Sequence, residues 1–455
     1  MDETKVIEET LRDTVERYLQ ENRYADIRML LLDMNYVDIE VLLSELQPDK
    51  MLRIFRMLPK ETAAEVFTEM DSDMQQYIIE SITDSEVVRI MDELFMDDTV
   101  DFLEEMPANV VKRVLKSTDE ATRKTINQLL QYPDDSAGSL MTTEFVDLKK
   151  EMTVKQALEH IRKTGVDKET INNCYVVSPQ RKLEGTVSIR TLILSQPDAT
   201  MEELMDTNIK YINTLDDQER SAYLFRKYDL LSMPVVDREQ RLVGIITIDD
   251  IVDVIEQENT EDFHKMAAIT PSEVPYLKTG VFTLAKNRVI WLLVLMISAT
   301  FTGFIIRSFE GTLSKVAVLT AYMPMLMGTA GNAGAQSSTM IIRSLALKEL
   351  DFSDILKVMW KELRVGATTA ILLAIVNFIR IMIFDSVTVP IALAVCLSLF
   401  CIVCLAKVIG GMLPVLADKI HVDPVLMASP IITTILDALS LFIYFRFATS
   451  ILGIA

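Results

Sequence analysis

The residue of this sequence best suited to bind a metal ion is an aspartate in an apolar segment near the C-terminus. Asp437 interrupts the otherwise uncharged run PIITTILDALSLFIYF. A charged side chain at the centre of a bilayer costs at least ~2.5 kcal/mol on insertion scales, so its presence predicts a function. Carboxylate oxygens favour hard ions such as Mg²⁺, Ca²⁺ or Mn²⁺. The alternatives are an interhelical hydrogen bond and a protonated carboxyl. Upstream, Pro430 is expected to leave the carbonyl of Leu426 without its helix partner.

A second stretch whose residues could bind an ion is residues 321–347. It combines apolar residues with three glycines and two amide side chains. Glycine lets the backbone approach an ion closely. Backbone at membrane depth leaves regular helix only where protein or a water-filled cavity satisfies its polar groups. We therefore expect a pore or binding-site helix, in which Gly328 and Gly331 let the backbone approach an ion. A helix-packing face of small and polar residues is the alternative.

Two groups of acidic residues outside the apolar segments are further candidate cation sites. In residues 248–268, side chains spaced by three or four residues share one helical face; these are Asp250, Asp253, Gln257 and Glu261, with Asp262 beside them. Like charges at this spacing destabilise a helix by a few tenths of a kcal/mol per pair, which a bound divalent cation would offset. The other group is the acidic run around Asp98. A solvated helix surface is the alternative for both.

Charge divides the chain into two parts. Residues 1–280 carry a net charge of −25 and residues 281–455 a net charge of +4, within the total of −21. An acidic soluble part argues against nucleic acid as a partner and against docking on anionic lipid, and it suits cations. Solubility alone would explain the same charge. The N-terminus, MDETKVIEETLRD, has no apolar core, so we expect no cleavable signal peptide.

The soluble part shows two successive patterns. From about residue 5 to 130, short apolar faces at helical spacing recur about every 12 residues, which predicts short helices stacked as a superhelix. From Tyr132 onward, YVV…KLEGTVSIRTLI and MPVVDREQRLVGIITIDDIV align as an internal duplication. Each copy predicts two strands followed by a helix, with strands expected at 173–177, 185–189, 233–236 and 242–248.

Five hydrophobic segments follow, each near the ~20 residues that span a bilayer. They lie at about 288–308, 316–343, 366–385, 388–416 and 425–453. Lys and Arg are more frequent on one side, and Lys357, Lys361 and Arg364 are expected in the loop after the second segment. This bias predicts a cytoplasmic N-terminus and an external C-terminus. Five helices are few for a solitary pore, so we expect a homodimer with the pore on its two-fold axis.

The run PMLMGTAGNAGAQSSTMIIRSLAL resembles the signature of the MgtE family of bacterial magnesium channels. The resemblance extends over nearly the whole chain. It implies a multidomain α plus α/β membrane protein with five parts: an acidic helical domain (1–131), two CBS motifs (132–197 and 198–256), a connecting plug helix with linker (249–280) and five transmembrane helices (281–455). It further implies that Asp437 is the central Mg²⁺ ligand and that Asp423 is the acid at the cytosolic mouth. The family's second-span motif falls on Gly328, Gly331 and Asn332, which are therefore expected to line the pore, and Ala428 lines it where the family often has Ser.

Together these features predict a dimeric Mg²⁺-selective channel in the bacterial inner membrane. Two Asp437 carboxylates across the dimer axis would match the charge of a largely hydrated Mg²⁺ ion. Mg²⁺ on the cytosolic side would bridge the acidic surfaces and close the pore; the residues expected to bind it are Asp98, Asp250, Asp253, Glu261, Asp262 and Asp423. Without Mg²⁺, Coulomb repulsion would open the pore.

Two other functions stay open at this stage. The chain could be an ion-coupled secondary transporter of divalent cations with a regulatory CBS module, or a membrane-anchored sensor that transports nothing. Some CBS pairs bind adenine nucleotides, although no feature here establishes one. An enzyme is not expected, because the sequence has no phosphate-binding P-loop and no catalytic triad.

Overall fold

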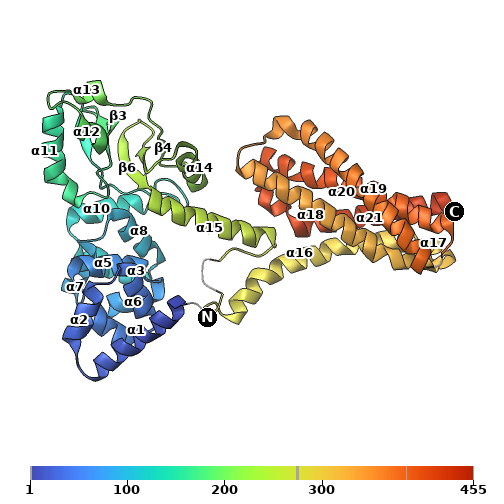
Figure 1. Ribbon diagram of the computed structural model, residues 1–455, viewed down its shortest axis with the longest axis horizontal. Helices are drawn as coiled ribbons and strands as arrows, with labels where there is room; N and C mark the ends of the chain where they lie inside the picture. The colour runs from blue at the N-terminus through green and yellow to red at the C-terminus, as the bar shows by residue number, and fades with distance from the viewer. Residues whose placement is uncertain (1–2, 273–275, 386, 454–455) are drawn as a thin grey trace. The chain divides into compact units, whose positions relative to one another are not determined.

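The computed structural model describes residues 3–272, 276–385 and 387–453. The described chain forms two compact units, Met1–Ile255 and Glu256–Ala455, and each is described by itself (Figure 1). The helix α15 (Ile248–Met266) runs from the first unit into the second. The first unit contains short helices and two small sheets, and the second is a bundle of long helices.

Short helices occupy the N-terminal half of the first unit, as the recurring apolar faces predicted. They are α1 (Glu3–Gln20), α2 (Tyr24–Leu32), α3 (Tyr36–Ser44), α4 (Pro48–Phe55), α5 (Lys60–Glu69), α6 (Ser72–Ser81), α7 (Asp84–Met91), α8 (Met96–Glu105), α9 (Ala108–Ser117) and α10 (Glu120–Leu129). Polar N-caps start several of them: the side chains of Asn35, Asp71 and Asp119 accept hydrogen bonds from the first backbone N–H groups. Buried Ile, Leu, Val, Phe and Met side chains from successive helices form one continuous core.

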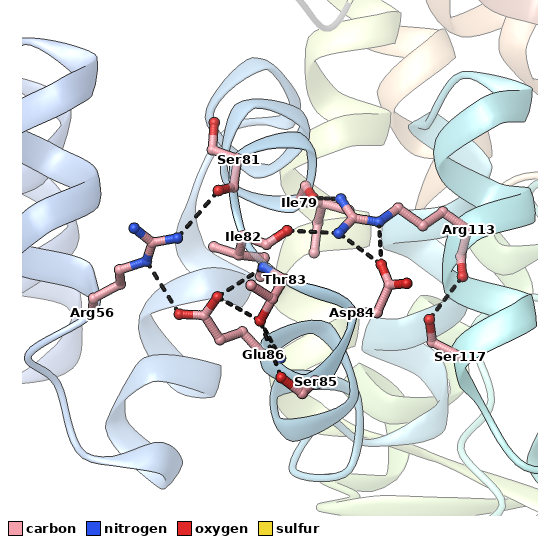
Figure 2. Close-up of polar contacts among 10 residues, drawn as sticks. All are labelled: Arg56, Ile79, Ser81, Ile82, Thr83, Asp84, Ser85, Glu86, Arg113 and Ser117. Atoms are coloured by element: carbon pink, nitrogen blue, oxygen red, sulfur yellow. Dashed lines mark hydrogen bonds and ion pairs between the residues drawn. The ribbon is translucent and has the colours of Figure 1, made fainter.

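Arginine side chains connect helices that are distant in sequence, as Figure 2 shows. Arg113 of α9 donates to the backbone carbonyls of Ile79 and Ile82 at the end of α6, and its Nε lies 2.8 Å from a carboxylate oxygen of Asp84 on α7. The carbonyls at a helix end have no partner within the helix, so these bonds satisfy groups that would otherwise need water. Arg113 therefore fixes the stacking of α9 on α6 and α7.

The second half of the first unit confirms the internal duplication. One sheet has the order β1 (Asp147–Lys149), β2 (Asn173–Val177), β3 (Leu183–Ser188), and the other has β4 (Ile212–Asn213), β5 (Ser232–Val236), β6 (Leu242–Thr247). In both, the first pair is parallel and the second antiparallel, with a register shift at the end of the middle strand. The helices of this region are η1 (Gly165–Asp167), α11 (Val154–Thr164), α12 (Ile189–Leu194), α13 (Met201–Leu204) and α14 (Gln218–Tyr228).

One hydrophobic core joins the short helices to the second sheet. Val100 of α8 and Leu129 of α10 are buried in the same cluster as Met233 of β5, Ile246 of β6 and Ile251 of α15. The alternating apolar residues of the strands and the helical faces of α8 and α10 thus share one interior. This packing fixes the acidic first turn of α8 close to the acidic start of α15.

The second unit is built from long helices connected by short 3₁₀ turns. They are α16 (Val281–Ser308), α17 (Glu310–Lys315), η2 (Ala317–Tyr322), α18 (Met323–Ala346), η3 (Phe352–Asp354), α19 (Ile355–Phe384), α20 (Val389–Lys419), η4 (Pro424–Met427) and α21 (Ser429–Leu452). The helix α18 packs against α20 and α21, and α19 packs against α20. Large apolar side chains remain exposed along α16 and α19, as expected for helices that face lipid.

Within the described residues, four segments are long and apolar enough to cross a membrane: 281–308, 352–384, 389–419 and 424–452. The expected count of five spans is therefore not confirmed. The fifth candidate, α18, is a continuous helix, but its Gly, Asn, Gln and Ser residues make it less apolar. The expectation of a loop around Lys357, Lys361 and Arg364 was wrong, because α19 already begins at Ile355 and carries all three.

Candidate metal sites

Asp437 lies on α21, eight residues after the start of that helix at Ser429. At 1.5 Å per residue this is about 12 Å, less than the ~20 Å counted from Pro424, because η4 and α21 are separate helices. The side chain is partly buried, and in the described part of the chain no hydrogen bond or ion pair involves its carboxylate. Its backbone carbonyl accepts a hydrogen bond from Ser440. The carboxylate oxygens are therefore available to an ion or its water shell.

The chain leaves helical geometry just before α21. Ala428 is extended, with φ −82° and ψ −167°. Pro430 lies in the first turn of α21, where its missing N–H would have no helix partner in any case. The Leu426 carbonyl, which Pro430 was expected to leave without a helix partner, belongs to the separate turn η4, so Pro430 removes no hydrogen bond from within α21. The hydroxyl of Ser338 on α18 donates to the Met427 carbonyl at 2.8 Å, so protein satisfies this irregular backbone.

The polar residues of α18 separate onto two faces. Gly328, Asn332 and Gln336 recur every four residues and are all exposed; we call them the polar stripe. Gly331 and Gly334 are buried on another face. A Cβ on Gly331 would lie 2.9 Å from Thr433 Cγ2, and one on Gly334 would overlap Leu436.

Gly331 and Ala428, both predicted to line the pore, are buried within this chain rather than exposed on the polar stripe. Gly331 allows close packing of α18 on α21 rather than presenting backbone on the polar stripe. Ala428 is 1 % exposed and is buried in a small cluster with Ile342 and Val425. Gly328 and Asn332 are exposed on α18, and their place on an ion path stays a prediction. The pattern of small residues alone could not separate glycines that pack against a neighbouring helix from glycines on an exposed face.

A second candidate site lies inside the first unit, where acidic side chains from five segments interact electrostatically. We call these the acidic cluster: Glu69 of α5, Asp97, Asp98 and Asp101 of α8, Glu144, Glu169, and Asp249, Asp250 and Asp253 of α15. Three of these were expected as cation ligands: Asp98, Asp250 and Asp253. Glu69, Glu144 and Glu169 were not identified, because no local pattern distinguishes them and only the fold brings them here.

Burial and mutual repulsion raise the pKa values in this cluster. Burial, aided by the Asp250 carboxylate, raises the pKa of Asp98 to about 7. Burial, with Glu104 and Asp250 nearby, raises the pKa of Asp101 to about 7. Burial together with Asp250 and Asp249 raises the pKa of Glu169 to about 8. Asp97 is 6 % exposed, and burial raises its pKa well above the ordinary value. Ionised carboxylates this close need a proton or a cation beside them.

Asp250 is held in place by its own helix start. Thr247 donates to one carboxylate oxygen of Asp250 from its hydroxyl at 2.7 Å and from its backbone N–H at 3.3 Å. Burial nevertheless raises the pKa of Asp250 to about 6, against the opposing effect of these hydrogen bonds. In the described residues no three Asp, Glu, His or Cys side chains are placed to hold a bare metal ion. The cluster therefore suits an ion that keeps part of its water shell, as Mg²⁺ does.

A third group of charges lies in the second unit, where the end of α15 meets the start of η4. Lys265 Nζ lies 2.8 Å from Glu261 Oε1 and 2.9 Å from Asp423 Oδ2. The other oxygen of Asp423 accepts the Val425 N–H at 2.8 Å. Burial and the Asp423 carboxylate raise the pKa of Asp262 to about 6. The expected ligands Glu261, Asp262 and Asp423 thus lie together, with a lysine among them that the sequence did not indicate.

Comparisons with known proteins agree with this architecture. A family model described as a divalent cation transporter matches residues 323–447, the model of the MgtE intracellular N domain matches 34–135, and the CBS domain model matches 137–197 and 201–257. The magnesium transporter MgtE of Thermus thermophilus is 36% identical over 451 residues, covering 98% of this chain and 99% of that protein. MgtE of Bacillus subtilis is 33% identical over 440 residues, covering 93% and 96%.

Solved structures match the first unit. The crystal structure of the cytosolic domain of the Mg²⁺ channel MgtE in complex with ATP has a TM-score of 0.52 and 34% identity, and it covers 53% of this chain and 99% of that one. The soluble part of a magnesium transporter has a TM-score of 0.51 and 27% identity, and it covers 55% and 99%. The short helices and paired sheets of this chain are therefore a known arrangement.

Proposed function

The chain belongs to the MgtE family, and from this premise we propose that it is a channel that imports Mg²⁺ and that cytosolic Mg²⁺ closes. Its relatives by name are magnesium transporters, and a solved relative is named a Mg²⁺ channel. These are transport proteins rather than enzymes. Mg²⁺ is the transported substrate in this proposal and also the ligand of the acidic groups.

The position of Asp437 is the observation that best supports the proposed transport step. Asp437 is the acidic residue of α21, its carboxylate has no partner among the described residues, and α21 packs against α18, which carries the polar stripe. A partly dehydrated or fully hydrated Mg²⁺ needs oxygen atoms and negative charge, and both are supplied here by a carboxylate and by amide oxygens. In a homodimer two Asp437 side chains supply −2 charge, enough to attract a divalent cation weakly and release it again.

In this proposal, Mg²⁺ binding to the acidic groups of the two units closes the channel. When cytosolic Mg²⁺ is scarce, the carboxylates of the acidic cluster repel each other and weaken the packing of α8 against α15. When Mg²⁺ is abundant, it binds among Asp98, Asp250 and Asp253 and removes that repulsion. Mg²⁺ near Glu261, Asp262 and Asp423 acts in the same way at the start of η4, next to the helix that carries Asp437. Closure then follows from cation binding, which Coulomb attraction drives.

The same proposal assigns a function to each domain of the chain. Residues 1–131, with the CBS motifs at 132–197 and 198–256, are the cytosolic sensor, residues 249–280 connect it to the membrane, and residues 281–455 are the transmembrane part with α18 as a fifth span. The protein is a homodimer in the lipid bilayer of the bacterial inner membrane, with its N-terminus inside and its C-terminus outside. An adenine nucleotide binds the CBS pair, as the ATP complex of the relative suggests.

Mg²⁺ flux into proteoliposomes tests the transport step. The wild-type protein is compared with Asp437→Asn, which removes the charge and keeps the shape, and with Asp418→Asn, the same change at the exposed end of α20. We expect Asp437→Asn to lose most of the flux and Asp418→Asn to keep it. Normal flux in Asp437→Asn would overturn the proposal. Flux that requires a Na⁺ or proton gradient would instead favour the coupled transporter.

A further inference from the structure

Three consecutive side chains of α18 each bind a different neighbouring element. Gln336 Oε1 accepts a hydrogen bond from Lys407 Nζ of α20 at 3.0 Å. The hydroxyl of Ser337 donates to Glu362 of α19 at 2.6 Å, and that of Ser338 donates to the Met427 carbonyl of η4 at 2.8 Å. Successive residues of a helix point about 100° apart, so these bonds hold α18 from three directions. Together they fix the rotation of α18 about its own axis.

Lys407 is the unusual member of this set. It is 7 % exposed and lies twelve residues before the end of α20 at Lys419, which is about 18 Å along the helix. The helices α19 and α20 pack closely around it, because a Cβ on Gly366 would lie 3.4 Å from Lys407 Cβ. The ion pairs of the described residues do not include Lys407; the partner of its ammonium is the amide of Gln336.

A buried lysine in a membrane helix has an unfavourable free energy of insertion. A charge at the centre of a membrane helix costs ~2.5 to 3.5 kcal/mol on insertion scales, and such residues usually mark ion paths. A neutral side chain of similar size would fill the same space without that cost. A lysine here therefore does not stabilise the bundle better than a neutral residue would. It can, however, orient the side chain of Gln336.

The hydrogen bond has a direct effect on the polar stripe, of which Gln336 is a member. An ammonium group only donates, so it binds the amide oxygen of Gln336 and determines which way the amide faces. Since Asn332 and Gly328 lie one and two turns earlier on the same face, the rotation that Lys407 fixes also sets their direction. The same rotation keeps Gly331 against Thr433 of α21, the helix that carries Asp437.

We propose that Lys407 is a positioning residue for ion permeation: its ammonium holds Gln336 and thereby fixes the rotation of α18 that presents the polar stripe to the passing cation. Glu362 is the opposing anchor, through Ser337. The proposal rests on the proposed function, because it assumes that the stripe faces the path. It assigns to Lys407 an effect on which cation passes, in addition to any effect on how much passes.

The test compares Mg²⁺ and Ca²⁺ flux in proteoliposomes for three variants of the full chain. Lys407→Met removes the donor and keeps an apolar side chain of similar length. Lys407→Arg keeps a charged donor on a side chain of similar length at the same position. Lys419→Met, at the exposed end of the same helix, removes the same charge outside the bundle.

We expect Lys407→Met to lower Mg²⁺ flux by about tenfold or more, the loss that one hydrogen bond to a charged group produces, and to reduce the ratio of Mg²⁺ to Ca²⁺ flux. Lys407→Arg should keep both the flux and the ratio, and Lys419→Met should resemble the wild type. The ratio is the decisive result, because a lysine that only stabilises the bundle would change the amount of active protein and leave the ratio alone.

Two results would overturn the inference: a wild-type flux ratio in Lys407→Met, or a Lys407→Arg variant that transports with the same altered ratio as Lys407→Met. If Lys407→Met does not accumulate in the membrane, Lys407→Arg decides alone: a flux ratio that departs from the wild type would count against the inference. Absence of Mg²⁺ flux in the wild type would instead refute the proposed function.

Discussion

Replacing Asp98 by Asn should stabilise the first unit when no divalent cation is present. Asp98 is partly buried on α8, and burial with the nearby carboxylates of Asp250, Asp249 and Glu69 raises its pKa from 3.8 to about 7. At pH 8 the carboxyl is ionised in both the folded and the unfolded chain, and the folded form bears the repulsion. The isosteric amide removes the charge and keeps the size.

The magnitude follows from the pKa. Each unit by which folding raises the pKa of an acid corresponds to about 1.4 kcal/mol against its ionised form, so ionised Asp98 destabilises the unit by at most about 4 kcal/mol. For a unit of this size, 1 kcal/mol moves the unfolding midpoint by about 2–4 °C. We therefore expect Asp98→Asn to raise the midpoint by several degrees at pH 8 in a chelator.

Mg²⁺ should reduce or reverse the difference in unfolding midpoint between Asp98→Asn and the wild type. A ligand at a hundred times its Kd stabilises the form that binds it by about 2.7 kcal/mol. The wild type has the full acidic cluster and should gain this stability. The variant lacks one proposed ligand, so its midpoint should rise less, and the gap between the two proteins should narrow or change sign at millimolar Mg²⁺.

Cys174 provides the assay. It is fully buried in the core of the first sheet, and the other three cysteines, Cys396, Cys401 and Cys404, lie on α20. Heating the full-length protein in detergent with a thiol reagent, followed by peptide mapping, therefore measures unfolding of the first unit alone. Glu65→Gln is the control, because it removes one charge from an exposed position on α5. A lower midpoint for Asp98→Asn in chelator, or equal Mg²⁺ shifts in both proteins, would refute the reasoning.

Three further predictions test the other sites. The folded acidic cluster retains protons that the unfolded chain releases near pH 4. The midpoint of thermal unfolding in chelator should therefore fall as pH rises from 6 to 8, and it should be nearly independent of pH in saturating Mg²⁺. A midpoint that rises across this pH window would contradict the raised pKa values of the cluster. Gly334→Ala should destabilise the bundle by about 1–3 kcal/mol, because its Cβ would overlap Leu436, whereas Gly328→Ala, with open space around it, should be neutral in thermal unfolding. Lys265→Met should lower the soluble-side Mg²⁺ concentration that halves the flux, by about two- to fivefold, because it frees two carboxylates for the ion; a higher concentration would contradict the site.

The sequence predicted those features that depend on local pattern. The strand at 173–177 and the repeated order of strands and helix were predicted correctly, because period-two apolar residues and the two aligned copies indicate them directly. The helical domain was predicted from apolar faces at helical spacing, and the MgtE family from one motif. Each of these signals lies within a few tens of residues.

Features that depend on contacts between distant segments could not be predicted in this way. Glu169 joins the acidic cluster only because the fold brings its loop beside α8 and α15. The same motif supplied both Gly331 and Gly328, and only packing shows that the first meets Thr433 while the second stays open. The role proposed for Lys407 also depends on tertiary structure, because a lysine in an apolar segment is usually read as a topology signal and its bond to Gln336 spans 71 residues.

The most direct test of the account is the initial rate of Mg²⁺ flux through the purified protein in a bilayer, measured at micromolar and at millimolar Mg²⁺ on the side of the soluble unit. The account predicts high flux at micromolar Mg²⁺, low flux at millimolar Mg²⁺, and loss of this inhibition when Asp98, Asp250 and Asp253 are replaced together by Asn. A flux that is independent of soluble-side Mg²⁺ in the wild type would contradict it.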